Sequence, residues 1–243
     1  MPNVVTQMAN REVCNLVFVD YKTKKPFLDV DYANVTTTEM TGEAVYAYGG
    51  WGHPKRITFH GERGGTIAIE TQITPFKLYS LITGGAVQTG ASWLKREVVT
   101  ATAADTLTIS NTTVTSVSVL PLDDGDGDVI DGTASSGTVS ATGVVSGKRY
   151  ACFYTVTLSN AKKISIKSTT FPGYFTVYGE TKDKMEDGTD ALYRMIAYKA
   201  APQTDFSLSF SNTGDPASIT ITCDLMADTN NNILDLILDD EEA

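Results

Sequence analysis

The chain has 243 residues, of which 42% are hydrophobic and 20% are charged, as in an ordinary folded globular protein rather than a disordered one. Its formal net charge of −10, and basic clusters no longer than runs such as TKDK, argue against tight binding to DNA, because phosphate contacts need basic patches. No apolar run approaches the roughly 18–20 residues of a membrane helix, and the first residues lack the pattern of a secretory signal. We therefore expect no membrane partner and a protein that begins its life in the cytoplasm.

Apolar residues recur with a period of two along most of the chain, which predicts β-strands. The runs that read as strands are 13–20, 56–62, 66–73, 106–110, 116–122, 149–158, 163–168, 174–181, 192–200, 206–211 and 218–225. Segments rich in Gly, Asn and Asp, at 60–65, 182–190 and 211–218, separate them as turns. The pattern predicts an all-β, mainly antiparallel fold, a β-sandwich or barrel of two packed sheets.

One short α-helix is predicted at about 75–83. Thr74 is the expected N-cap, Pro75 the first helical residue and Gly84–Gly85 the stop. The C-terminal segment at about 230–243 fits either a short helix or a final strand, and its acidic end is expected to be a solvated tail.

We expect a single β domain over residues 1–243. The segment at about 100–147 differs from its flanks, because it is rich in Thr, Ser, Gly and Asp and nearly devoid of Lys and Arg. It is read as two strands and long loops that elaborate the main domain. The alternative is a separate small domain, which would have little core.

Recognisable catalytic motifs are absent from the sequence, which has no G-x-S-x-G elbow, Walker loop or H-E-x-x-H. The two histidines, His53 and His60, are read as structural. Cys14, Cys152 and Cys223 are read as buried free thiols. We name no catalytic residue and expect neither enzyme activity nor a cofactor.

The segment LDDGDGDVIDG (122–132) places Asp124, Asp126 and Asp128 two residues apart, with Asp131 close behind. Calcium binds carboxylates on such turns, so these four residues are candidate metal ligands. An EF-hand loop that opened at Asp124 would need an acidic residue where Ser135 stands. The alternative is an acidic surface loop without metal, in which Asp and Gly serve turn geometry.

The stretch 32–55 carries aromatic and Met side chains in a Gly- and Thr-rich context, and is read as a long loop. Exposed aromatic side chains supply large contact area at a low entropy cost, which suits a protein–protein contact. Met40, Tyr46, Tyr48 and Trp51 are therefore candidate interface residues. In the alternative, the stretch is a hairpin whose aromatics fold back onto the core.

The order of these elements resembles the tail tube proteins of long-tailed bacteriophages. The resemblance lies in GERGGTIAIETQITPFKLYSLITGG and in the β-rich run from FPGYFTVYGE to SITITCDLMAD, and it covers roughly 10–85 and 149–228. It implies two packed antiparallel sheets with one helix on the flank. It also implies subunits that form hexameric rings, stacked into the virion's tail tube as the conduit for DNA ejection into the host.

The same resemblance implies that a loop, here Met40 to Pro54, reaches the neighbouring ring and supplies the candidate inter-ring contacts. It implies an acidic lumen through which DNA passes without tight binding, and assembly in the host cytoplasm. The further partners it implies are baseplate or initiator proteins, a terminator, and a sheath if the tail is contractile.

Other phage β-sandwich proteins, such as a tail terminator, a baseplate hub component or a capsid decoration protein, would have equally strand-rich and catalytically empty sequences. A calcium-dependent carbohydrate-binding or adhesion module is a further alternative, and it would need calcium at the Asp-rich segment beside exposed aromatics. Self-assembly without a calcium requirement distinguishes a tube protein from such a module.

Overall fold

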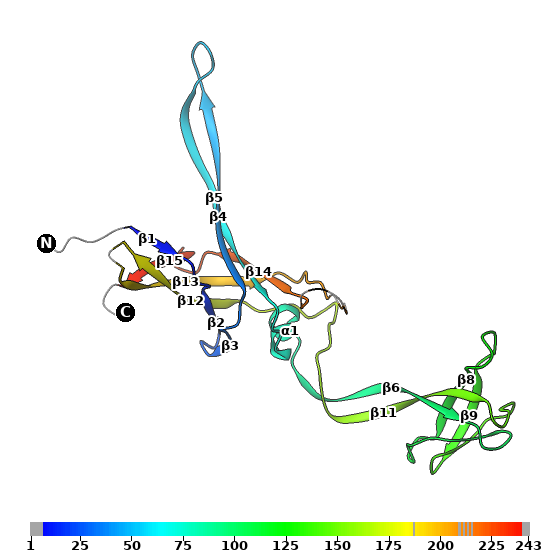
Figure 1. Cartoon of the computed structure of the whole chain (residues 1–243). Helices are drawn as coiled ribbons and strands as arrows, with labels where there is room; N and C mark the ends of the chain where they lie inside the picture. Colours follow the sequence, from blue (N-terminus) through cyan, green and yellow to red (C-terminus); the bar gives the residue numbers. More distant parts are fainter. Residues whose placement is uncertain are drawn as a thin grey trace. The chain divides into compact units, whose positions relative to one another are not determined.

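The computed structural model describes residues 7–186, 188–208, 210, 212, 214 and 216–239 (Figure 1). The chain divides into two compact units, called unit 1 (residues 1–86 and 164–243) and unit 2 (residues 87–163). Each unit has its own antiparallel sheet and its own hydrophobic core. The predicted all-β class is thereby confirmed. The Thr- and Ser-rich segment at about 100–147 lies inside unit 2, whose bounds are wider.

The sheet of unit 1 has nine strands in the order β3-β2-β12-β13-β14-β5-β4, with β1 paired to β12 and β15 paired to β13. Their bounds are Met8–Asn10 (β1), Asn15–Asp20 (β2), Pro26–Val30 (β3), Val35–Tyr48 (β4), Lys55–Thr71 (β5), Phe175–Met185 (β12), Asp190–Pro202 (β13), Ile219–Met226 (β14) and Leu234–Asp239 (β15). The alternation of the sequence sets which side chains face the core. In β5, Ile67 and Ile69 are buried, whereas Ala68 between them is half-buried.

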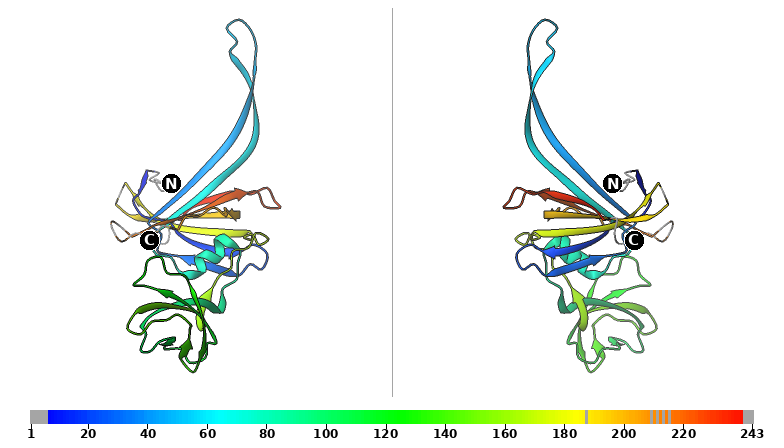
Figure 2. Two further views of the ribbon diagram at one scale, coloured as in Figure 1. Left: turned by 90° about the vertical axis from the view of Figure 1, so that its right-hand side faces the viewer. Right: turned by 90° about the vertical axis from the view of Figure 1, so that its left-hand side faces the viewer.

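The core of unit 1 lies between one face of this sheet and helix α1 (Phe76–Thr83). Leu16 and Phe18 of β2 and Leu78 and Leu81 of α1 are fully buried in it. Figure 2 shows the helix beside β3, which it contacts. Within the described residues no helix is long and apolar enough to cross a membrane.

The C-terminal end of α1 lies where the sequence predicts it, but the N-cap is not the predicted residue. Gly84 adopts the left-handed conformation (φ 68°) and its N–H donates to the carbonyl of Ser80, so the predicted stop is confirmed. The prediction of Thr74 as N-cap is wrong, because Pro75 occupies the N-cap position and no side chain caps the helix.

The sheet of unit 2 has six strands in the order β6-β11-β8-β9-β10-β7. Their bounds are Gln88–Thr100 (β6), Thr106–Thr108 (β7), Ser116–Pro121 (β8), Ile130–Ser135 (β9), Thr138–Ser140 (β10) and Arg149–Lys163 (β11). The core includes the fully buried Leu107, Val117 and Tyr154. Strands β6 and β11 pair from Gln88 opposite Lys163 to Thr100 opposite Arg149, and they carry the chain into and out of unit 2.

Further sequence predictions of local structure are wrong. The segment at about 100–147, predicted to form two strands and long loops, contains the four strands β7 to β10. The predicted turn at 60–65 is continuous strand within β5. The run 163–168 is not a strand beyond Lys163, where β11 ends. In the run 206–211 the described residues form no strand, and residues 209 and 211 lie outside the described part. The C-terminal segment forms strand β15, and the acidic residues 240–243 lie outside the described part.

The three cysteines are free thiols. Cys152 and Cys223 are buried and Cys14 is half-buried. Burial raises the pKa of Cys223 to about 12, so this thiol stays protonated at neutral pH and packs as a small apolar side chain.

Candidate assembly surface

Strands β4 and β5 form one long hairpin, and its base and outer half differ in their partners. At the base, Gly65–Thr71 of β5 pairs with β14 on one side, and Gly65–Glu70 pairs with β4 on the other. In the outer half, among the described residues, β4 and β5 pair only with each other, up to Tyr48 opposite Lys55. We call this outer half, residues 42–63, the arm. In Figures 1 and 2 it extends away from the rest of unit 1.

One face of the arm is apolar. Val45 lies opposite Phe59 and Ala47 lies opposite Ile57, and residues directly opposite in an antiparallel pair project to the same side. The exposed fractions are 66% for Val45, 56% for Ile57 and 57% for Phe59. Neighbouring apolar side chains left in water are typical of contact surfaces.

The opposite face of the arm carries tyrosines and a basic group. Tyr46 lies opposite Thr58, and Tyr48 lies opposite Lys55. The Nζ of Lys55 lies 3.6 Å from the centre of the Tyr46 ring, a cation–π contact. The arm therefore presents an apolar face and an aromatic, cationic face.

A glycine-rich turn places Trp51 at the end of the arm. Gly50 and Gly52 have φ values of 86° and 82°, a backbone conformation that residues with a Cβ rarely adopt. The Trp51 side chain between them is fully exposed. An exposed Trp at the end of a projecting hairpin suits a contact with another molecule better than a role in folding.

The four candidate interface residues lie on this one hairpin. Tyr46, Tyr48 and Trp51 are on the arm, and Met40 is at its base, opposite Gly65. The prediction of a long loop is wrong, because residues 35–48 are strand β4. The alternative, a hairpin whose aromatics fold back onto the core, is right about the hairpin and wrong about the aromatics. Tyr48 (57% exposed) and Trp51 project into solvent instead of onto the core.

Sequence reasoning missed the apolar face formed by Val45, Ile57 and Phe59. The alternation of RITFHGE is the same whether a strand lies on a core or in water, so the pattern could not reveal that this strand leaves the sheet. Clustered β-branched and aromatic residues on both sides of the glycine turn were the available signal.

The candidate metal ligands Asp124, Asp126, Asp128 and Asp131 are not brought together as a set. Across the described part of the chain, no three His, Cys, Asp or Glu side chains are placed to hold a metal ion. The Asp124 carboxylate instead accepts the backbone N–H of Asp126 at 3.3 Å, which is turn geometry, and Asp131 lies within β9.

Asp123, next to that segment, has a structural contact that the sequence did not indicate. Its carboxylate accepts the backbone N–H of Arg149 at 2.9 Å and the Arg149 guanidinium at 2.9 Å. These hydrogen bonds, the backbone one foremost, lower the pKa of Asp123. The contact fastens the segment after β8 to the start of β11.

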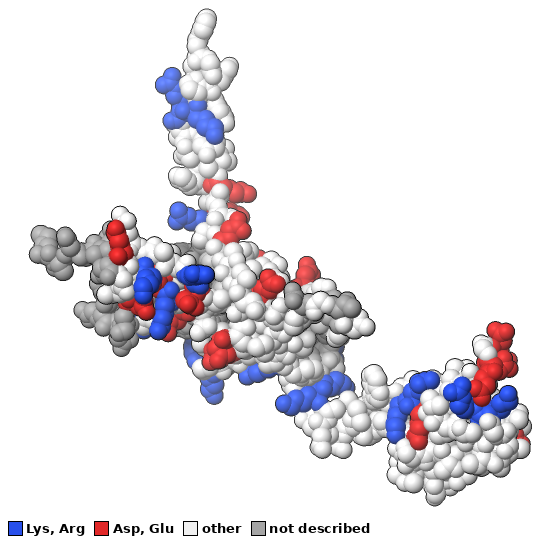
Figure 3. Space-filling view, in the orientation of Figure 1, with Lys and Arg blue, Asp and Glu red and all other residues white. Residues whose placement is uncertain are grey.

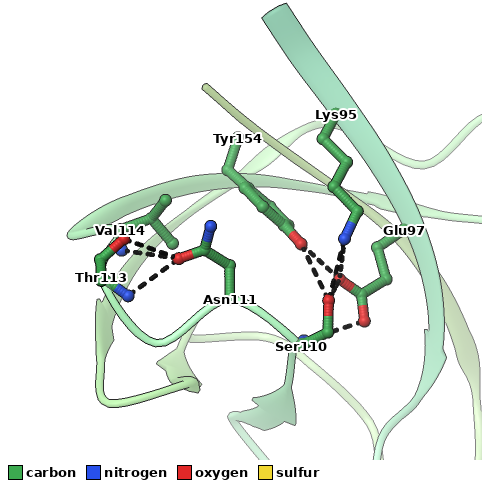
Figure 4. Close-up of polar contacts among 7 residues, drawn as sticks. All are labelled: Lys95, Glu97, Ser110, Asn111, Thr113, Val114 and Tyr154. Carbon is green, nitrogen blue, oxygen red and sulfur yellow. Dashed lines mark hydrogen bonds and ion pairs between the residues drawn. The ribbon is translucent and has the colours of Figure 1, made fainter. Parts of the chain in front are cut away.

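A hydrogen-bonded cluster joins the two edges of the unit 2 sheet (Figure 4). The Glu97 carboxylate of β6 accepts the hydroxyl of Tyr154 in β11, and it accepts the backbone N–H (2.9 Å) and hydroxyl (2.8 Å) of Ser110, which follows β7. The Lys95 Nζ donates to the Ser110 hydroxyl at 2.9 Å. Burial acts to raise the pKa of Glu97, but the hydrogen bonds from Tyr154 and Ser110 outweigh it and the pKa is lowered. A charged, fully bonded carboxylate here holds the sheet together.

Charge is unevenly distributed along the hairpin. Residues 44–60 include Lys55 and Arg56 but no Asp or Glu, on a chain whose net charge is −10. Glu43, Glu62 and Arg63 lie at the inner end of the arm. Figure 3 shows blue side chains and no red ones on the outer part of the hairpin, and both colours near its base.

The model of the YomU/Tube protein family matches residues 10–237. The match therefore includes the hairpin, both units and the strands of each sheet except the start of β1 and the end of β15. No curated protein matches the chain.

Proposed function

Because this chain belongs to the YomU/Tube protein family and is a structural protein of a phage tail tube, we propose that its copies form hexameric rings that stack into that tube. In this proposal the tube is the conduit for DNA ejection into the host. The subunits are made in the host cytoplasm and end in the tail of the virion.

The observation that carries the proposal is the arm. A two-stranded hairpin alone is at best marginally stable in water. This one leaves Val45, Ile57 and Phe59 more than half exposed. Seating the apolar face on another subunit would remove that area from water, at about 25 cal/mol per Å². We infer that the arm crosses to a neighbouring ring, with Met40, Tyr46, Tyr48 and Trp51 among its contact residues.

The strand order of unit 1 supports assembly around a ring. Strands β3 and β4 stand at the two ends of the order, where backbone groups are left for further pairing. Open sheet edges invite uncontrolled association, and a closed ring of subunits pairs or covers them.

The charge supports a conduit for DNA. A net charge of −10 repels phosphate, so DNA would move past the subunits without binding tightly. Baseplate or initiator proteins and a terminator at the tube ends, and a sheath around a contractile tail, are the further partners of this role.

Negative-stain electron microscopy of the purified protein at high concentration, with size-exclusion chromatography beside it, tests the proposal. We expect hollow tubes or stacked hexameric rings. The double substitution Ile57→Ser and Phe59→Ser should reduce tube formation while the far-UV circular dichroism spectrum is unchanged. Thr58→Ser, on the opposite face of the same strand, is the matched control and should assemble normally. A protein that stays monomeric even when isolated tail tips are added as initiators would contradict the proposal.

A further inference from the structure

One face of the unit 1 sheet packs against the core, and this face extends past the residues that cover it. Met195 of β13 is 6% exposed, whereas Leu236, its register partner in β15, is 60% exposed. Met40 of β4 and Met8 of β1, each 44% exposed, border the same region. A sheet face of this kind is normally covered by a second layer, so this part lacks one within the described residues.

A groove of about 560 Å³ lies on the uncovered part. That volume falls in the range of about 300–1,000 Å³ that is typical of ligand pockets. Its apolar lining includes Met8, Cys14, Met40 and Leu236. The groove is therefore an apolar surface that is continuous with the core.

The charged residues of the groove are acidic. Glu12 and Asp183 line it, and among the described lining residues there is no Lys or Arg. Asp183 is 6% exposed, and its carboxylate accepts the side-chain N–H of Asn10 at 2.6 Å, which holds it in place.

We propose that this groove receives the arm of a second copy of the chain. The apolar face of the arm fits the apolar lining. The arm also has the opposite charge to the groove, because its residues 44–60 include Lys55 and Arg56 and no Asp or Glu, whereas Glu12 and Asp183 line the groove. The inference rests on the proposed function, since it names the surface on which the arm of a neighbouring subunit lies.

The arm of the same chain cannot be the occupant. Thr36, Thr38 and Met40 of β4 line the groove, and β4 continues from them as one strand to Tyr48. The arm therefore begins at the border of the groove and extends away from it.

The contact has a consequence for symmetry. Each copy offers both an arm and a groove, so a copy whose arm is seated on one neighbour still presents its groove to another, and the contact can repeat from ring to ring as a heterologous one. A heterologous contact that does not close adds subunits indefinitely, which is what a stack of rings requires.

Disulfide trapping between two different chains tests the proposal. In a Cys14→Ser background, a Phe59→Cys chain and a Leu236→Cys chain are mixed in equal amounts at the concentration used for microscopy and then oxidised. We expect several-fold more linked heterodimer than from Thr58→Cys, on the opposite face of the arm, mixed with the same Leu236→Cys chain. Mass spectrometry of the linked peptide identifies the joined residues. Met40→Cys provides a second position in the groove if Leu236→Cys does not fold.

The outcomes separate the inference from the proposed function. Linked heterodimer above the control supports the arm-in-groove contact, with or without tubes. Tubes with no linkage above the control at either groove position would overturn the groove assignment and leave the tube function standing. Neither tubes nor linkage, even with isolated tail tips added as initiators, would overturn both.

Discussion

Replacing Tyr154 with Phe removes one hydroxyl from the cluster that joins the edges of the unit 2 sheet. Tyr154 is 2% exposed, and its hydroxyl donates to the Glu97 carboxylate. A hydrogen bond to a charged group contributes about 1.5–3 kcal/mol. The Glu97 side chain keeps 21% exposure and two hydrogen bonds from Ser110, so water and Ser110 compensate in part. We expect a loss of about 1.5 kcal/mol in the free energy of unfolding of unit 2.

The loss should depend on pH. The pKa of Glu97 in the folded protein is lowered from its usual 4.5. A carboxyl with a lowered folded pKa stabilises the fold above its unfolded pKa, and this contribution is lost as the pH falls through the folded pKa. The difference between the parent protein and Tyr154→Phe should therefore be full at neutral pH and shrink below pH 4.5.

Hydrogen exchange detected by mass spectrometry measures the stability of unit 2 separately from that of unit 1. At neutral pH, amides of β6 and β11 should exchange about tenfold faster in Tyr154→Phe, since 1.4 kcal/mol corresponds to a factor of ten. Tyr150→Phe is the control, because the Tyr150 hydroxyl accepts the backbone N–H of Val145 at 2.8 Å and involves no carboxylate. Equal pH dependence in the two variants, or unchanged exchange in Tyr154→Phe, would refute the reasoning.

The remaining predictions concern the arm and two surface features. Tyr48→Ala with Trp51→Ala should impair assembly in electron microscopy without changing the melting temperature, and an unfolded double variant would place these aromatics in the core instead. Gly65→Ala should destabilise unit 1 by about 1–3 kcal/mol in thermal unfolding, because an added Cβ would lie 2.4 Å from the Glu39 carbonyl oxygen, whereas Gly125→Ala, with no atom within 4 Å of its Cβ, should be neutral. Asp126→Asn with Asp128→Asn should leave tube formation and melting temperature unchanged with or without a calcium chelator, and a loss that calcium rescues would restore the metal reading.

Much of the fold could be predicted from alternation. The run 218–225 became β14 within one residue at each end, and Gly84 ended the helix for the conformational reason read in the sequence. The runs 163–168 and 206–211 alternate equally well, yet their described residues are not strands beyond Lys163. Alternation reports that a segment suits a half-buried surface, whereas forming a strand also requires a neighbour to pair with.

Glycine misled the prediction at 60–65. The run HGERGG has the composition of a turn, but Gly65 lies within β5, where Glu39 and Met40 of the opposite strand leave no space for a side chain. For the candidate site, residue type was enough to identify Tyr48 and Trp51. Recognising the apolar face of the arm required knowing that β5 extends past its partner β14, which is a property of the sheet and not of the segment.

The way unit 2 joins the chain bears on how this subunit can change over generations of phage. Gln88 stands opposite Lys163, so the chain leaves and re-enters unit 1 through a single pair of neighbouring residues. None of the strands of the unit 1 sheet is interrupted between these two points. An exchange of everything between them, or its reduction to a short turn, would need no new register in the unit 1 sheet. Recombination at this position can therefore give the subunit a different appendage while the parts that fold the sheet and present the arm are inherited unchanged.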